Sequence, residues 1–125
     1  MLKDSHAFSG FSVDNLEVAK KFYGETLGLD VSENEQGLMV RLLGSNGVFV
    51  YEKDDHVPAT YTILNFPVDD IDATVDELAA AGIVFERYKD MTDEKGIARG
   101  LEINRGPNIA WFKDPAGNFL SVQQD

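Results

Sequence analysis

The stretch FSVDNLE, residues 11–17, is matched 55 residues later by FPVDDID, residues 66–72. Each copy combines an apolar strand end, an acidic or amide helix cap and the first apolar residue of a helix. A glycine suited to a helix end follows each copy, Gly28 in the first and Gly82 in the second. Two matched features at nearly one spacing predict a domain built from a duplicated half.

In the first half, Asp14 or Asn15 is expected to cap a helix that follows the strand HAFSGFSV, residues 6–13. Three further strands are predicted, and Asn46-Gly47 is typical of a two-residue hairpin between the last two. These strands are LDVSE (29–33), LMVRLLG (38–44) and VFVYEK (48–53).

In the second half, Asp69 or Asp70 is expected to cap a helix after the strand TYTILNFPV, residues 60–68. The sequence Asp114-Pro115-Ala116-Gly117 favours a type I turn that joins the last two strands. The later elements are IVFERYK (83–89), a less regular stretch through IARGLEI (97–103), NIAWFK (108–113) and NFLSVQ (118–123).

These patterns predict one α+β domain, residues 1–125, made of two βαβββ modules that form a curved mixed sheet with helices on its outer face. Module 1 covers about residues 5–53, the linker about 54–59 and module 2 about 60–125. The other sides of the two sheets are left to face each other or a ligand.

Composition excludes several classes of function. With 11 Lys and Arg against 22 Asp and Glu, the net charge of -11 repels nucleic acids and anionic membranes. The chain has no cysteine, which excludes disulfides and thiolate metal sites. It has neither an apolar run that could cross a bilayer nor a signal peptide, so a cytoplasmic protein is expected.

The segments VDNLEVAKKFYGETLGLDV (13–31) and WFKDPAGNFLSV (111–122) resemble the superfamily of glyoxalases, bleomycin-resistance proteins and extradiol dioxygenases, also called the vicinal oxygen chelate fold. The resemblance implies a cup-shaped pair of sheets that holds a small ligand, usually in a homodimer. Many members bind a divalent metal ion through His and Glu side chains, one from each of four strands.

Matching the motifs places those four ligand positions at Phe8, Ile63, Ser121 and either Val50 or Glu52. Apolar side chains and one hydroxyl cannot replace the hydration of a divalent cation. No metal or other cofactor is therefore expected, with a divalent metal as the alternative.

Strand alternation predicts which other side chains face the cup. Gly10 and Ser12 share a face with Phe8, Tyr61 and Asn65 with Ile63, and Phe119 and Gln123 with Ser121. Either Trp111 or Phe112 faces the cup, and Arg41 faces either the cup or the rim of the sheet. The candidate ligand-binding residues are Phe8, Gly10, Arg41, Val50, Glu52, Tyr61, Ile63, Asn65, Trp111, Phe112, Phe119 and Ser121.

The roles of two histidines and of one long segment are less clearly indicated by the sequence. His6 lies near the cup's rim or belongs to a frayed terminus, and His56 is expected to be a solvated histidine of the linker. Residues 88–108 form either a lid over the cup or a plain connection.

The sequence favours a metal-free homodimer that sequesters or carries a small organic ligand, either cationic or aromatic. No catalytic residue is assigned. A lyase or dioxygenase whose metal is held by displaced ligands such as His6, Glu52 and Glu102 is the alternative. A scaffold that meets another protein through its surface is a third possibility.

Overall fold

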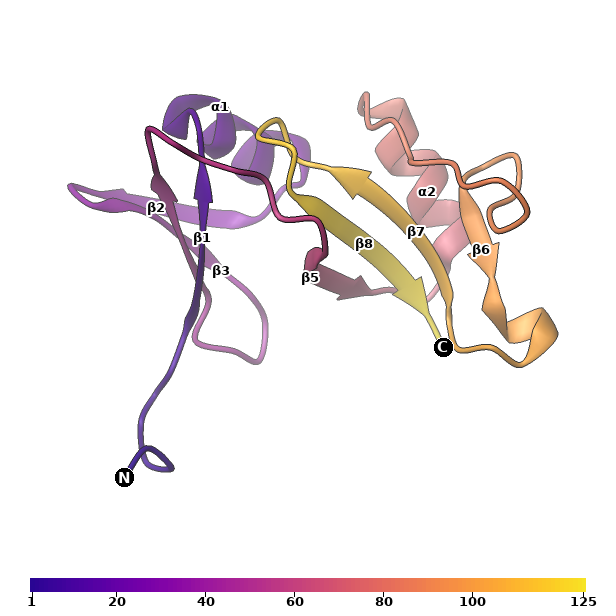
Figure 1. The fold of residues 1–125 in the computed structure, drawn as a ribbon, viewed down its shortest axis with the longest axis horizontal. Helices are drawn as coiled ribbons and strands as arrows, with labels where there is room; N and C mark the ends of the chain where they lie inside the picture. Colours follow the sequence, from indigo (N-terminus) through magenta and orange to yellow (C-terminus); the bar gives the residue numbers. More distant parts are fainter. The chain divides into compact units, whose positions relative to one another are not determined.

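The computed structural model describes residues 1–125, which divide into two compact units, Met1–Pro58 and Ala59–Asp125. The expected linker, residues 54–59, spans this boundary. Each unit has the order strand, helix and three further strands (Figure 1). Each also forms one open four-stranded sheet with parallel and antiparallel pairs. The α+β architecture and the two βαβββ modules predicted from the sequence are therefore confirmed.

In unit 1 the sheet has the strand order β1-β4-β3-β2, in which β1 and β4 are parallel. The connection between β3 and β4 covers residues 42–47, so the two-residue hairpin expected at Asn46-Gly47 is wrong. Asn46 instead donates a side-chain hydrogen bond to the Ala7 carbonyl at 2.9 Å. The elements are β1 (Ser9–Val13), α1 (Leu16–Lys21), η1 (Phe22–Thr26), β2 (Asp30–Asn34), β3 (Gly37–Arg41) and β4 (Val48–Glu52).

The start of α1 is fixed by two side chains. Asn15 is the N-cap, and its oxygen accepts a hydrogen bond from the Val18 amide at 3.1 Å. A Glu52 oxygen, on the last strand of the unit, accepts from the Leu16 amide at 2.9 Å. Because the first amides of a helix have no partner within the helix, both contacts satisfy donors that would otherwise need water.

The helix continues into η1, a π-helical turn in which the Leu27 amide donates to the Phe22 carbonyl at 2.9 Å. This turn places Phe22 and Tyr23 in the core, where their rings meet edge to face at 5.1 Å. The core of unit 1 consists of Val13, Ala19, Phe22, Tyr23, Leu38, Val40, Val48 and Val50.

In unit 2 the sheet has the order β5-β8-β7-β6, with β5 and β8 parallel. The expected strand IVFERYK is wrong: Ile83 and Phe85 are buried as in a strand, but only one backbone hydrogen bond, from Glu86 to Trp111, ties the segment to β7. The edge strand is instead β6. The elements are β5 (Thr62–Pro67), α2 (Ile71–Ala80), β6 (Ile97–Arg99), η2 (Gly100–Ile103), β7 (Asn108–Lys113) and β8 (Phe119–Gln124).

Helix α2 begins in the same way as α1. Asp70 is the N-cap and accepts from the Ala73 amide at 3.1 Å. The side-chain oxygen of Gln124, at the end of the last strand, accepts from the Ile71 amide at 2.9 Å. Both halves of the duplicated sequence therefore cap their helix in the same way, with the N-cap side chain and with a side chain from the end of the last strand.

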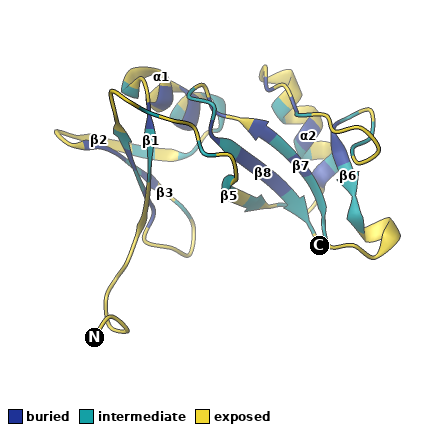
Figure 2. Cartoon of the chain, viewed as in Figure 1, coloured by how far each residue is buried: buried dark blue, intermediate teal, exposed yellow.

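One face of the second sheet is covered by α2, which packs on β7 and β8. The core there consists of Ile71, Val75, Ile83, Phe85, Ile97, Ala110, Phe112, Leu120 and Val122. Figure 2 shows these buried positions along β7 and β8, whereas the segment before β1 is exposed. No helix in the structure has the length and apolar character that crossing a membrane requires.

The final hairpin has the turn that its sequence predicts. The Gly117 amide donates to the Asp114 carbonyl at 2.9 Å, and Gly117 has a φ of 87°, which suits glycine. A side-chain oxygen of Asp114 also accepts from the Asn118 amide at 2.8 Å. This turn, with Asp114 and Asn118 buried, fixes the register of β7 against β8, and thereby which side chains lie on each face.

Candidate functional site

The candidate site lies on the face of the second sheet that points away from α2. Leu120 and Val122 are buried on the helix side of β8, and Gln124 contacts the first residue of α2. Because side chains alternate along a strand, the other face carries Phe119, Ser121 and Gln123. Their cross-strand partners on β7 are Lys113, Trp111 and Ile109.

This face contains a small aromatic pocket of about 110 Å³. Trp111 meets Tyr88 edge to face, with ring centroids 5.7 Å apart. Tyr61 leaves 70% of its surface exposed, which is high for an aromatic residue. The lining residues are Thr60, Tyr61, Thr62, Tyr88, Trp111 and Phe119.

Polar side chains continue the same face next to the pocket. The Ser121 hydroxyl donates to the Asn65 Oδ1 at 2.6 Å, and the Gln123 Nε2 donates to the same oxygen at 2.7 Å. Ser121 is paired with Trp111 on one side and with Asn65 on the other, so the three form one row across the sheet. Ile63 lies half-buried at an irregularity in the pairing of β5 with β8.

A balanced pair of charges borders the pocket. The Lys113 ammonium lies 5.0 Å from the centroid of the Phe119 ring, which is a cation–π contact. The same ammonium is 3.4 Å from a Glu86 carboxylate oxygen. The local charges therefore offset each other, and aromatic surface is the main feature that the pocket offers.

An ion-pair network holds the segment that supplies Tyr88. Arg99 donates two hydrogen bonds to Asp72 of α2, at 2.8 and 2.9 Å, and one to Asp93 at 2.9 Å. Asp93 also accepts from the Ile97 and Lys95 amides, each at 2.9 Å. The segment is thus tied to α2 and to β6, which makes it more than a plain connection.

The network shifts the pKa values of its members. Hydrogen bonding to Arg99 lowers the pKa of Asp72 well below its usual range, and the same bonds raise the pKa of Arg99. Partial burial tends to raise the pKa of Asp93, but bonds from the Ile97 amide and from Arg99 more than offset this, so its pKa is lowered. All three groups are therefore charged at neutral pH.

The open face of the first sheet is also partly aromatic. Gly10 and Ser12 are paired with Phe49 and Tyr51, whose rings stack at 5.9 Å. Phe8 precedes β1 and is 60% exposed. These positions, unlike Val50, lie on the side of the sheet opposite to α1.

His56 is not a freely solvated loop residue. Its Nδ1 lies 2.7 Å from the Ser12 hydroxyl, and the ring is half-buried. His6, in contrast, is exposed before the first strand.

Two candidate residues of β4 lie on the helix side of the sheet, contrary to the expectation. Val50 has no exposed surface and is paired with Phe11, whose ring is 5.8 Å from Tyr23. Glu52 shares this side and caps α1. The β4 residues of the open face are Phe49 and Tyr51, so the expected alternation was shifted by one residue.

The structure resolves the orientation of three further candidates. Trp111 lies on the open face, whereas Phe112 is buried against Phe85 at a centroid distance of 5.6 Å. Arg41 lies on the open side of the first sheet with 80% of its side chain exposed, and its Nε is 3.9 Å from Asp30. Such an exposed, loosely paired arginine is a rim residue.

The residues at the four expected metal positions do not fit a divalent cation. Phe8, Val50 and Ile63 offer no donor atom, and the Ser121 hydroxyl is already bonded to Asn65. No three side chains of the types His, Cys, Asp and Glu lie close enough together to hold a metal ion.

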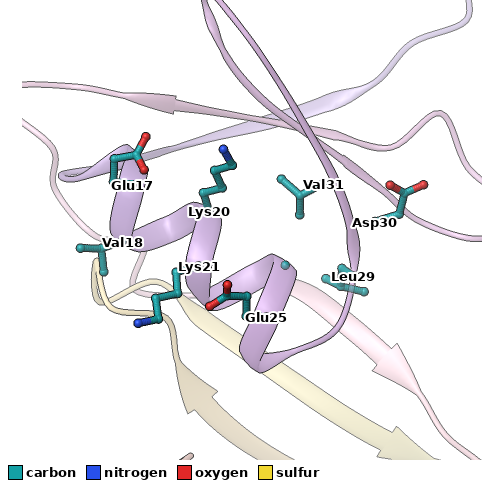
Figure 3. Close-up of a pocket in the computed structure, with 9 residues that line it drawn as sticks. Glu17, Val18, Lys20, Lys21, Glu25, Leu29, Asp30 and Val31 are labelled. Atoms are coloured by element: carbon teal, nitrogen blue, oxygen red, sulfur yellow. The ribbon is translucent and has the colours of Figure 1, made fainter.

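A second hollow lies on the helix side of unit 1, between α1, η1 and the start of β2. It has a volume of about 810 Å³ and is lined largely by charged side chains (Figure 3). One of them, Lys20, is paired with Glu33 at 2.8 Å, and this contact raises the Lys20 pKa. The lining residues are Glu17, Val18, Lys20, Lys21, Gly24, Glu25, Leu29, Asp30 and Val31. A wide groove with five charged side chains in its wall and no aromatic side chain is a poor match to a site for an aromatic ligand.

The sequence matches the family model described as Glyoxalase/Bleomycin resistance protein/Dioxygenase superfamily over residues 6–122. The chain belongs to this superfamily. Solved structures of the glyoxalase fold are similar over almost the whole chain. A glyoxalase family protein from Enterococcus faecalis is 23% identical with a TM-score of 0.68, and the match covers 98% of each chain.

Two other members of the glyoxalase fold are comparably similar. TnmS3, an antibiotic binding protein from Streptomyces sp. CB03234, is 24% identical with a TM-score of 0.65, and the match covers 99% of this chain and 98% of that one. A superfamily member from Sphaerobacter thermophilus DSM 20745 is 21% identical with a TM-score of 0.65, with 95% and 97% covered. Curated proteins gave no match to the sequence. At these identities the comparisons show the fold.

Some residues on the open faces of the two sheets were not among the candidates from sequence. Phe49 and Tyr51 were not among them because matching the family motifs places the β4 position at Val50 or Glu52, each one residue further along the strand. Tyr88 was missed because its segment has no regular periodicity, and its contact with Trp111 joins residues far apart in the sequence. No local signal identifies the first two, because residues 48–51 are all apolar or aromatic.

Proposed function

We propose that this protein binds a small aromatic molecule, without a metal ion, on the open face of sheet β5-β8-β7-β6, and that it sequesters or carries this molecule. The observation that carries the proposal is the pocket formed by Tyr61, Tyr88, Trp111 and Phe119. Aromatic walls with a few polar groups are typical of sites for small organic ligands.

Three further features support the proposal. At the expected metal positions, Phe8 and Ile63 offer no donor atom and Ser121 offers only a hydroxyl, while both β4 candidates, Val50 and Glu52, lie on the helix side of the sheet. TnmS3, a protein of the same fold, is described as antibiotic binding. The net charge of -11 attracts cationic compounds at long range, although the charges next to the pocket offset each other.

Trp111 is the only tryptophan of the chain, so its fluorescence reports directly on the pocket. We expect 9-aminoacridine, a flat cation, to quench this fluorescence with micromolar affinity. Phe119→Ala should weaken binding by about fivefold or more, because a stacked aromatic pair contributes about 1 kcal/mol beyond its buried area. Leu101→Ala, an exposed substitution outside the pocket, is the control. Equal affinity in the wild type and Phe119→Ala would contradict the proposed site.

The charge of the ligand is tested with a matched anion. Naphthalene-2-sulfonate has a similar aromatic surface but the opposite charge. We expect it to bind more weakly than the acridine at low ionic strength, with the difference shrinking as salt is added, because the long-range field is screened.

Absence of a metal is tested by elemental analysis of protein purified without chelators. We expect less than one tenth of an equivalent of Zn, Ni, Mn or Fe per chain. One full equivalent that is lost in Glu52→Ala would favour the metal-dependent lyase or dioxygenase. Because Glu52 caps α1, the folded content of this variant must be measured as well.

We also propose a homodimer and a cytoplasmic location. Light scattering during gel filtration should give about twice the 13.8 kDa mass of one chain. A monomeric mass at micromolar concentration would contradict the dimer.

A further inference from the structure

The side-chain amides of Asn65 and Gln123 form a pair on the open face of the second sheet. Asn65 Oδ1 accepts two hydrogen bonds, from Ser121 at 2.6 Å and from Gln123 Nε2 at 2.7 Å. Gln123 Nε2 makes one further contact, with the Ser121 hydroxyl at 3.4 Å. These bonds leave the Asn65 Nδ2 group and the Gln123 Oε1 atom without a protein partner. The pair therefore presents one unused donor and one unused acceptor.

The pairing of strands places these amides beside the aromatic pocket. Trp111, Ser121 and Asn65 lie in one row across β7, β8 and β5, and Phe119 and Gln123 flank Ser121 on the same face. Neighbouring strands are about 4.8 Å apart, so this row spans roughly 10 Å. A bicyclic aromatic molecule that contacts Trp111 can therefore reach the amide pair with its edge.

A donor next to an acceptor is complementary to a group that offers the reverse pair. A cis amide, in which a carbonyl oxygen and an N–H lie on the same edge of a ring, is such a group. The complementarity does not depend on how the amides are turned. If both rotated by half a turn, Asn65 would present its oxygen and Gln123 its nitrogen, and one donor and one acceptor would remain.

We propose that the site recognises an aromatic or heteroaromatic ring that carries a lactam or another cis amide along its edge. This inference rests on the proposed function, because the ring must occupy the aromatic pocket. The site distinguishes ligands because a polar atom that loses water without gaining a hydrogen bond raises the free energy of the complex. A ligand without the N–H would place two acceptors face to face, with Gln123 Oε1 losing water and gaining no donor.

The test compares two compounds of nearly identical shape. Quinolin-2(1H)-one has the cis amide, whereas coumarin carries a ring oxygen in place of the N–H. Isothermal titration calorimetry of the wild-type protein should give at least tenfold tighter binding of the quinolinone. In Gln123→Ala this preference should fall to twofold or less, because the quinolinone loses its acceptor and coumarin no longer faces an unmatched oxygen.

Gln123→Ala is a suitable variant because it leaves the bond between Ser121 and Asn65 in place. Gln36→Ala, an exposed substitution in the loop between β2 and β3, should keep the full preference. Equal affinity of the two compounds for the wild type would overturn the inference, and so would a preference that survives in Gln123→Ala.

The two proposals fail in different ways. If 9-aminoacridine quenches Trp111 but the quinolinone has no advantage over coumarin, the aromatic pocket stands and the amide recognition is wrong. If none of the aromatic compounds binds, both are overturned.

Discussion

Replacing Arg99 with Met should destabilise the second unit in a pH-dependent way. Methionine keeps an apolar stem of similar length but removes three charge-assisted hydrogen bonds, of 2.8 to 2.9 Å, to Asp72 and Asp93. The Asp72 side chain is 46% exposed and the Arg99 side chain 27%, so the contacts are partly screened. We expect a loss of about 2 kcal/mol at pH 7 in the free energy of unfolding, with about 1 kcal/mol from each carboxylate.

The pH dependence follows from the direction of the pKa shifts. Arg99 lowers the pKa values of Asp72 and Asp93 in the folded state, whereas in the unfolded chain both carboxyls titrate near pH 4. The stabilisation is therefore complete above about pH 4 and is lost as the pH falls toward the lowered folded values. The difference in stability between wild type and Arg99→Met should shrink steadily as the pH falls from about 4 to 2.

Urea unfolding followed by circular dichroism at a series of pH values measures this difference. At pH 7 the thermal midpoint of the second unit should fall by about 10 °C, given roughly 4–8 °C per kcal/mol for a domain of this size. Arg105→Met is the control, because Arg105 is exposed and makes no ion pair. The reasoning is refuted if Arg99→Met costs no more than the control, or if its cost is the same at pH 2 and at pH 7. Tyr88 should also become more mobile, which weakens acridine binding.

Three substitutions test the packing that positions the site. Phe112→Ala empties a buried position against Phe85 and should cost about 3–5 kcal/mol in urea unfolding; a loss below 1 kcal/mol would mean that Phe112 is not in the core. Gly37→Ala places a methyl group against the Val50 carbonyl and should cost about 1–3 kcal/mol, whereas a neutral effect would contradict the close approach of β3 and β4. Asp114→Ala removes the acceptor for the Ala116 and Asn118 amides and should cost about 2 kcal/mol; unchanged stability would show that the turn does not need this carboxylate.

Much of the fold follows from the sequence because its signals are local. The duplicated strand, cap and helix start at residues 11–17 and 66–72 require no long-range information, and the same is true of the turn at Asp114. The strand expected at residues 83–89 fails for the opposite reason. Its alternation is correct, with Ile83 and Phe85 buried, but whether a segment gains a ladder of hydrogen bonds depends on the neighbouring strand. Here β6 occupies that place.

The site is predicted in part, and the limits are physical. Phe119, Ser121 and Asn65 share a face because alternation and the turn fix the register of β8. Motif matching placed Val50 on the wrong side, and alternation offers no correction because every residue from 48 to 51 is apolar or aromatic, so no polar side is visible. The ion pairs of Arg99 and the contact between Tyr88 and Trp111 join distant parts of the chain and leave no local signal. The joining of the two open faces into one cup, the dimer and the absence of a metal stay predictions.

The contacts of Glu52 with Leu16 and of Gln124 with Ile71 imply an order of events during synthesis. In each unit the final strand is both the parallel neighbour of the first strand and the source of the side chain that ties down the helix start. A nascent chain that has not yet released Val48–Glu52 from the ribosome leaves β1 unpaired. The second unit depends in the same way on its last strand, so β5 stays unpaired until Phe119–Gln124 has left the ribosome.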